Sequence, residues 1–300
     1  MLILSRKSAA NNRFCRPTEF PGFLYNRFMA KHFYELSPAA FELSLFLHRT
    51  GRGVKNLFQS PGFAAHRQED FLPYPVVEHD SPLYRNLTDQ DQILQDNKIR
   101  NLQLACEQLN TLIIRPGETF SFWHTLKKPT LQAGYREGLM IAGSRMSTGI
   151  GGGLCQAANM IHYLVLHSPL EVKELHHHSD ALFPDQQRRV PFGIGTSVAW
   201  NHIDYRFYNG TDQSFQLIME MEIAVLHGEL RCSAELPWTY RLREEDHHYR
   251  QEDKTWYRIS RVYRDQIDKA SGTIMETRLI LNNHSRVMFD PALIPDDEKR

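Results

Sequence analysis

The sequence has few cysteines, no net charge and no long apolar run. The four cysteines are scattered without a CxxC pair, which excludes a disulfide framework: Cys15, Cys106, Cys155 and Cys232. Lys and Arg total 35 and so do Asp and Glu, so nothing draws the whole chain to nucleic acid. No stretch is long enough to span a bilayer, and the opening MLILSRKSAANNRF has too short an apolar segment for a signal peptide. We therefore expect a cytoplasmic protein.

What is present indicates a globular fold with unevenly distributed charge. At 300 residues, 41% of them hydrophobic and 11% aromatic, the chain can form one large domain or two smaller ones. Residues 1–67 hold ten Lys and Arg but only three Asp and Glu. This basic region predicts a weak contact with an anionic surface such as a membrane, although residues 1–30 also fit a solvated leader. No specific nucleic-acid partner is expected.

Helical patterns come first along the chain. Ser37-Pro38 is a typical N-cap and N1 pair, so we expect a helix over residues 38–49 and then a connecting loop over residues 59–89. Apolar residues at helical spacing in DQILQDNKIRNLQLACEQLN predict a second helix. In TLIIRPGETFSFW, the alternation around Pro116-Gly117 predicts strand, turn, strand.

Strand patterns dominate after a helix that begins near Cys155. EVKELHHH, TSVAWNHIDYRFYN and QSFQLIMEMEIAVL are strand-like, with turns at Asn209-Gly210 and His227-Gly228, and two more strands flank Ser271-Gly272. The order predicts an α+β fold, with N-terminal helices followed by a mainly antiparallel sheet on which the cysteine-bearing helix packs. We divide the chain into a basic arm with a helix and connecting loop, a core domain, and a C-terminal β extension packed on the core: residues 1–90, 91–235 and 236–300.

The segment GIGGGLCQ places three consecutive glycines just before Leu154 and Cys155. A glycine run is useful where φ is positive or where another group must come close. A cysteine in a first helical turn lies among unpaired N–H groups, which favour its thiolate. The combination indicates a reactive or binding site.

A cysteine nucleophile needs a base, and the base needs a group that orients it. His178, at the end of the LHHH run, and Asp204, in HIDYRF, follow Cys155 in the order found in papain- and transglutaminase-like enzymes. With the Gln156 amide or nearby backbone N–H groups stabilising an oxyanion, these residues would form a cysteine hydrolase or acyltransferase. The structural alternative makes Cys155 a small buried residue beneath a tight glycine turn.

Other chemistries fit the same residues less well. GIGGGL lacks the Lys-Ser/Thr of a P-loop and the spacing of a dinucleotide fingerprint, so no cofactor is expected. Adjacent strand residues point to opposite faces, so at most His176 and His178 could share a zinc ion, and we expect no metal site. The candidate ligand-binding residues are Gly151, Gly152, Gly153, Glu118, Trp123 and His176, in a pocket that Phe122 and Tyr135 help to line.

Three segments resemble the VanW family, which is named after a vancomycin-resistance gene cluster: LNTLIIRPGETFSFW, GYREGLMIAGSRMSTGIGGGLCQAANMIHYLVLHSPLEV and HHHSD. The resemblance is most specific over residues 97–231. It implies a link to glycopeptide resistance or cell-wall metabolism, and no catalytic residue, because the family's activity is not established. Relatives commonly have GGGxCQxS and DATV where this chain has GGGLCQAA and GTSV, which weakens any role for a hydroxyl at the serine position and means that the acid cannot be essential here. Many relatives carry an export signal or membrane anchor, and we expect neither here.

Two hypotheses follow from these residues. In the first, the protein is a Cys155-dependent enzyme that acts on an amide or ester of a peptide or cell-wall precursor. In the second, it is a non-catalytic module in which the glycine loop and helix start bind the carboxylate or phosphate of such a ligand.

Overall fold

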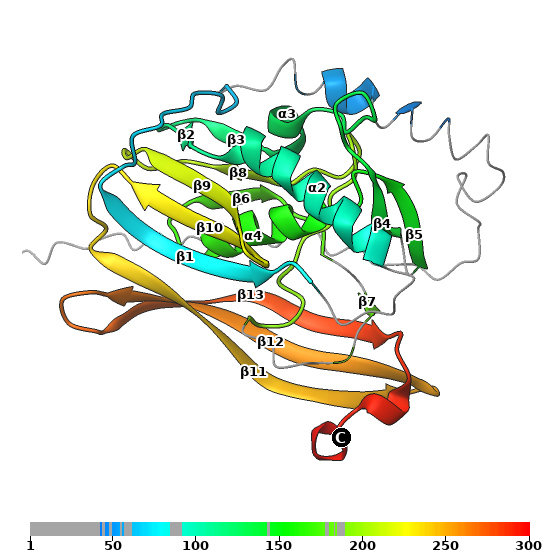
Figure 1. Cartoon of the computed structure of the whole chain (residues 1–300). Helices are drawn as coiled ribbons and strands as arrows, with labels where there is room; N and C mark the ends of the chain where they lie inside the picture. The colour runs from blue at the N-terminus through cyan, green and yellow to red at the C-terminus, as the bar shows by residue number, and fades with distance from the viewer. Residues whose placement is uncertain are drawn as a thin grey trace, which may run out of the picture. The chain divides into compact units, whose positions relative to one another are not determined.

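The computed structural model describes residues 43, 46–47, 50–54, 56, 62–84, 92–142, 145–177, 180–182, 184 and 190–300. The chain forms two compact units, Met1–Ser44 and Leu45–Arg300, and all labelled elements of Figure 1 lie in the second. This unit is built mostly of antiparallel sheets with few helices, which confirms the predicted α+β class. The division at residues 90 and 235 stays a prediction.

The cysteine-bearing helix packs against a four-stranded antiparallel sheet of order β1-β10-β9-β2. The elements are α4 (Cys155–Leu166), β1 (Tyr74–Pro82), β2 (Leu112–Ile114), β9 (Phe215–Glu222) and β10 (Val225–Cys232). Helix α4 lies against β1 and β10, as predicted. Gly228 in β10 makes this approach possible, since a Cβ there would come within 2.6 Å of the Met160 side chain.

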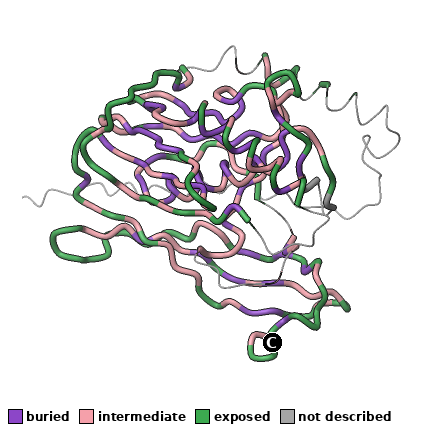
Figure 2. Tube along the Cα trace, in the orientation of Figure 1, coloured by how far each residue is buried: buried purple, intermediate pink, exposed green. Residues whose placement is uncertain are grey.

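Helix α2 (Gln92–Leu109) covers β9 and confirms the helix predicted from apolar spacing. Its buried positions recur every three or four residues, as in an amphipathic helix: Gln95, Asn101, Leu102, Ala105, Cys106 and Leu109. Figure 2 shows buried segments concentrated where α2, α4 and the four-stranded sheet meet. One hydrophobic cluster therefore joins both helices to this sheet.

The core also contains a smaller antiparallel sheet, of order β3-β8-β6, and a separate two-stranded hairpin. The elements are β3 (Thr119–Ser121), β6 (Glu171–Glu174), β8 (Arg206–Tyr208), and the hairpin strands β4 (Glu137–Ala142) and β5 (Arg145–Ile150). The predicted strand, turn, strand around Pro116-Gly117 is confirmed, but its strands join different sheets. The short helix α3 (Phe122–Leu126), capped by the Ser121 hydroxyl, was not predicted.

Three long C-terminal strands and one short strand form another sheet, and β12 and β13 confirm the two strands predicted around Ser271-Gly272. Its order is β11-β12-β13-β7, with β7 parallel to β13: β11 (Trp238–Glu252), β12 (Thr255–Asp268), β13 (Ile274–Val287) and β7 (Asp180–Ala181). Two short 3-10 helices follow: η3 (Pro291–Leu293) and η4 (Asp296–Glu298). Val262 of β12 packs with Leu166 and Ile194, so the sheet is joined to the end of α4.

Four sequence predictions about element positions are wrong. The strand expected over TSVAWNHIDYRFYN covers only Arg206–Tyr208, since the residues before it form turns and an isolated bridge. The region 59–89 is not only a connecting loop, because β1 lies in it and pairs with β10 at the edge of the sheet, where its prolines are tolerated. His227-Gly228 lies inside β10, and the turn comes at Ile223-Ala224 instead. The strand expected over EVKELHHH ends at Glu174, so the described His176 and His177 lie beyond it.

The helix expected over residues 38–49 continues further than predicted. Residues 46–47, 50–54 and 56 are helical, so the helix runs through two glycines. The Arg52 guanidinium forms two 2.7 Å hydrogen bonds with the Glu174 carboxylate, and the Asn56 Oδ1 accepts one of 2.9 Å from Arg206. These contacts of the last turns with the small sheet explain the longer helix.

Candidate functional site

The glycine loop before α4 needs glycine at all three positions, for two different reasons. Gly151 and Gly153 have φ of +81° and +92°, in the left-handed region that L side chains rarely adopt. Gly152 lies against Gly138 of β4, where a Cβ would overlap with the facing carbonyl group. The prediction that the loop needs positive φ or a close approach is confirmed, and the group that approaches Gly152 is the protein's own backbone.

A buried asparagine of α2 holds this loop in place. Asn101 Nδ2 donates to the carbonyl oxygens of Gly152 (2.9 Å) and Arg136 (3.0 Å), and its Oδ1 accepts from the Arg136 N–H (2.7 Å). Gly151 N–H also donates to Arg136 O. The loop is therefore preformed and clamped between α2 and the strand that begins after Arg136. Asn101 is a polar residue within the apolar stripe of α2, and this is the sequence signal by which it could have been found.

Cys155 is the first residue of α4, and its sulfur faces a carbonyl group. Sγ lies 3.9 Å from the oxygen of Val198, in the GTSV segment. The residue is partly exposed, but protein surrounds the sulfur so closely that burial raises the pKa of the thiol. Burial therefore shifts this pKa in the direction opposite to the one expected of the helix dipole.

Two other residues in the first turns of α4 hold neighbouring segments. Gln156 Nε2 donates to Ser81 Oγ and to Pro82 O, both at 2.9 Å, so its amide anchors the end of β1. Asn159 Oδ1 accepts from the Thr196 N–H at 2.7 Å. The GTSV segment is thereby tied to the same helix face that carries Cys155.

Asp204 is buried and its carboxylate is fully engaged near α3. It accepts hydrogen bonds from Ser121 Oγ (2.6 Å), Trp123 N–H (3.1 Å), Tyr205 N–H (3.0 Å) and Arg206 Nε (2.7 Å). No histidine is among these described partners. The carboxylate stabilises the first turn of α3 and neutralises the buried Arg206.

Glu174 extends this charge cluster toward the N-terminal helix. Burial acts to raise the pKa of Glu174, but hydrogen bonds from His176 and Arg52 outweigh it and hold the pKa at about 2. Arg206 Nε lies 3.6 Å from the same carboxylate. Arg52, Glu174 and Arg206 were not singled out in the sequence, because they are distant along the chain and come together only in the fold.

The described histidines of the HHH run face polar partners at the surface. His176 Nε2 lies 3.2 Å from Glu174 Oε1, and His177 Nδ1 lies 2.9 Å from Gly193 O. His178 lies outside the described residues, so the relay of Cys155, His178 and Asp204 stays a prediction. Within the described ranges, no group of three or more His, Cys, Asp and Glu side chains could hold a metal ion.

The remaining candidate residues make contacts in a turn and in the hydrophobic core. Glu118 Oε2 accepts from the Arg115 N–H at 2.8 Å and closes the turn before β3. Trp123 is buried edge-on against Phe122 and Trp200, and its Nε1 donates to Ile203 O at 2.9 Å. The pocket residues Phe122 and Tyr135 are buried in the same core.

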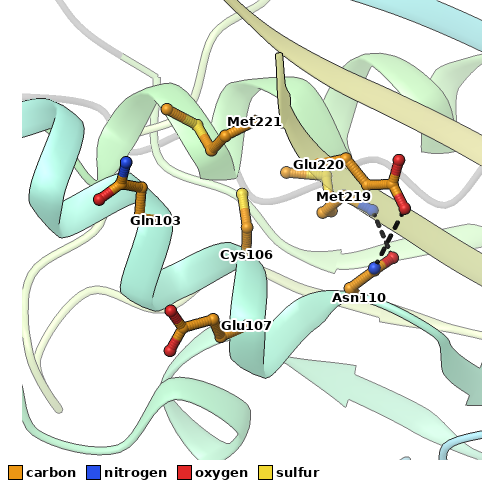
Figure 3. Close-up of a pocket in the computed structure, with 7 residues that line it drawn as sticks. All are labelled: Gln103, Cys106, Glu107, Asn110, Met219, Glu220 and Met221. Carbon is orange, nitrogen blue, oxygen red and sulfur yellow. Dashed lines mark hydrogen bonds between the residues drawn. The ribbon is translucent and has the colours of Figure 1, made fainter.

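A groove lies elsewhere, between α2 and β9 (Figure 3). It has a volume of about 270 Å³ and is lined by Gln103, Cys106, Glu107, Asn110, Met219, Glu220 and Met221. The Cys106 sulfur points from α2 toward the two methionines of β9. Burial, reinforced by the two glutamates, raises the pKa of the Cys106 thiol to about 12. This cysteine is a thiol at neutral pH, consistent with a packing role.

None of the described helices is long and apolar enough to cross a bilayer.

Comparison with known proteins gives one family and two relatives. The family described as VanW like protein matches residues 97–231. The chain is 30% identical over 221 residues to the Vancomycin B-type resistance protein VanW of Enterococcus faecalis (strain ATCC 700802 / V583). The aligned region covers 74% of this chain and 80% of that protein. It is 28% identical over 148 residues to the uncharacterized protein YoaR of Bacillus subtilis (strain 168), and this aligned region covers 47% of this chain and 46% of that protein. No solved structure matches the chain.

Proposed function

The chain belongs to the VanW family, and on this premise we propose that it acts in glycopeptide resistance or cell-wall metabolism as a cytoplasmic binding module. Its ligand would be an anionic cell-wall precursor or peptide, held at the start of α4. The similarity to the enterococcal resistance protein supports the biological setting. We favour binding over catalysis because of the surroundings of Cys155.

That environment disfavours a nucleophile. Burial raises the pKa of the Cys155 thiol, whereas a catalytic thiolate needs a lowered one. The carboxylate proposed to orient a base, Asp204, has its described hydrogen bonds with α3 and Arg206. The amide proposed for an oxyanion hole, Gln156, is bound to β1.

The same loop has features that suit an anion. Helix α4 directs the positive end of its dipole toward the glycine loop, and the methylene groups of Lys98 lie against Gly153, while its ammonium group donates to the Leu83 carbonyl oxygen. Because Asn101 holds the loop in one shape, a ligand site there would be preformed, although the Gly151 and Gly152 N–H groups already donate to Arg136 O and Gly149 O. A carboxylate or phosphate is the group that this arrangement would recognise.

The binding proposal is tested by calorimetry with UDP-linked muramyl pentapeptide as the probe. We expect Cys155→Ser to bind it within a few-fold of the wild type, because the thiol only fills space, and Lys98→Met to bind about tenfold more weakly. Cys106→Ser, in the groove between α2 and β9, is the matched control. Absence of binding by the wild-type protein, or unchanged binding by Lys98→Met, would contradict this assignment.

The cysteine-enzyme hypothesis remains as a second candidate because Cys155 lies on a first helical turn and is partly exposed. It requires Cys155 to be alkylated at neutral pH much faster than Cys106, and an acyl adduct on Cys155 by mass spectrometry after incubation with the muramyl peptide. In a host whose vancomycin resistance depends on this chain, Cys155→Ser would then abolish resistance, whereas the binding module would retain it.

A further inference from the structure

The N-terminal helix exposes its apolar side chains and turns its polar ones inward. Phe46, Leu47 and Val54 are 64%, 59% and 51% exposed. These positions fall on one side of a helix, together with the exposed Thr50. A helix of a globular protein ordinarily does the reverse, so this face is unpartnered within the described part of the chain.

The inverted orientation is set by specific contacts. Arg52, on the opposite side of the helix, forms the paired hydrogen bonds with Glu174 and a third with His202 O at 3.0 Å. Asn56 accepts from Arg206, whose Nε is bonded to Asp204. The partners Glu174 and Arg206 belong to the charge cluster of the small sheet, which also includes Asp204. The helix is therefore held with its apolar face outward.

The charge of the surrounding sequence indicates what that face meets. Residues 43–67 contain Arg49, Arg52, Lys55 and Arg67 and no acidic residue, within a region of ten basic and three acidic side chains. Because the whole chain is neutral, the rest is correspondingly acidic. An anionic surface would therefore attract this basic segment and bring the apolar face of its helix to the surface.

We propose that the helix around Phe46, Leu47 and Val54 docks on the surface of a membrane that contains anionic lipids. The apolar side chains enter the boundary between headgroups and acyl chains, and the neighbouring basic residues pair with lipid phosphates. The contact is interfacial. It would deliver the α4 site to membrane-linked precursors, but it does not depend on what that site binds.

The test is co-sedimentation of the full-length protein with vesicles. We expect binding to vesicles containing phosphatidylglycerol and at least about tenfold weaker binding to phosphatidylcholine alone. The double variant Phe46→Ser/Leu47→Ser should lose at least about tenfold in binding, because it removes two inserted side chains. Arg49→Gln and Lys55→Gln should each weaken binding about fivefold. Ile223→Ser, at a 98% exposed apolar residue in the β9–β10 turn, is the matched control and should bind as the wild type does.

Several results would overturn the proposal. These are no binding by the wild type, equal binding to both vesicles, or undiminished binding by Phe46→Ser/Leu47→Ser. A wild-type dimer that this double variant converts to a monomer, with vesicle binding unchanged, would assign the face to a second copy of the chain instead. Loss of muramyl-peptide binding without loss of vesicle binding would leave this proposal intact and refute only the function proposed for α4.

Discussion

Gly138 and Gly152 meet backbone to backbone beneath the start of α4. A Cβ on Gly138 would lie 2.8 Å from the carbonyl oxygen of Gly152, and a Cβ on Gly152 would lie closer still to the Gly138 carbonyl. Neither strand β4 nor the glycine loop can move away, because Asn101 is bonded to both the loop and Arg136. The GGG run is therefore explained by packing within the protein.

Gly152→Ala should destabilise the protein by about 1–3 kcal/mol, the usual cost of forcing extra volume into a close-packed site. Urea unfolding followed by circular dichroism measures it. Gly51→Ala is the matched control: nothing lies within 4 Å of its added Cβ and its φ is ordinary for an L-residue, so it should stabilise the helix by up to about 1 kcal/mol. Equal stability of the two variants would refute the packing argument.

Lys127→Gly should stabilise the protein by about 1 kcal/mol. Lys127 ends α3 with φ of 59° and ψ of −165°, a conformation that is almost restricted to glycine, and its side chain is exposed. Lys128→Gly, at the next exposed position, serves as the control and should be neutral or slightly destabilising. Thermal melting compares the two variants. A lower melting temperature for Lys127→Gly than for the wild type would contradict the argument that the Lys127 backbone is strained.

The stability of the fold should depend on pH through His162. This buried residue of α4 lies with Nδ1 2.9 Å from the Tyr205 hydroxyl, and burial lowers its pKa to about 3. Between about pH 6.5 and 3 the unfolded chain binds a proton that the native state does not. The free energy of unfolding should therefore fall by about 1.4 kcal/mol per pH unit below 6.5 from this group alone.

His162→Asn keeps a polar atom near Nδ1 and removes the titration, so its unfolding free energy should fall less steeply with decreasing pH. His227→Asn is the control, because hydrogen bonding to Asp80 raises the pKa of His227, although its partial burial acts to lower it. Removing that group should not reduce the loss of stability on acidification. Parallel profiles for wild type and His162→Asn would show that His162 titrates normally.

Asp204→Asn should cost about 3 kcal/mol or more, because it removes the nearer and more deeply buried of the two carboxylates that face the buried Arg206. Glu171→Gln, which breaks the exposed pair with Lys173, should cost less than about 1 kcal/mol. Denaturant unfolding compares them. If Asp204→Asn folded with normal stability but lost function, a catalytic role for Asp204 would be favoured over the structural one.

The sequence by itself predicted the parts whose signals are local. Helix α2 follows from its apolar spacing, the start of α4 from the glycine run, and the turn at Ser271-Gly272 from its residue types. The need for glycine before Cys155 was also visible, since few other reasons place three glycines in a row. The family resemblance carried the same local motifs.

Only the tertiary structure decided what those residues touch. Gly228 resembled a turn in the sequence, yet it lies within β10 because Met160 packs over it. The environment of Cys155 depends on Val198, and that of Asp204 depends on Ser121 and Arg206. Val198 and Ser121 are distant along the chain from the residues that they contact. Burial and hydrogen bonding depend on neighbours that folding brings together, and they set the protonation and availability of each group. Sequence spacing could therefore name the candidate residues, but their roles depend on the fold.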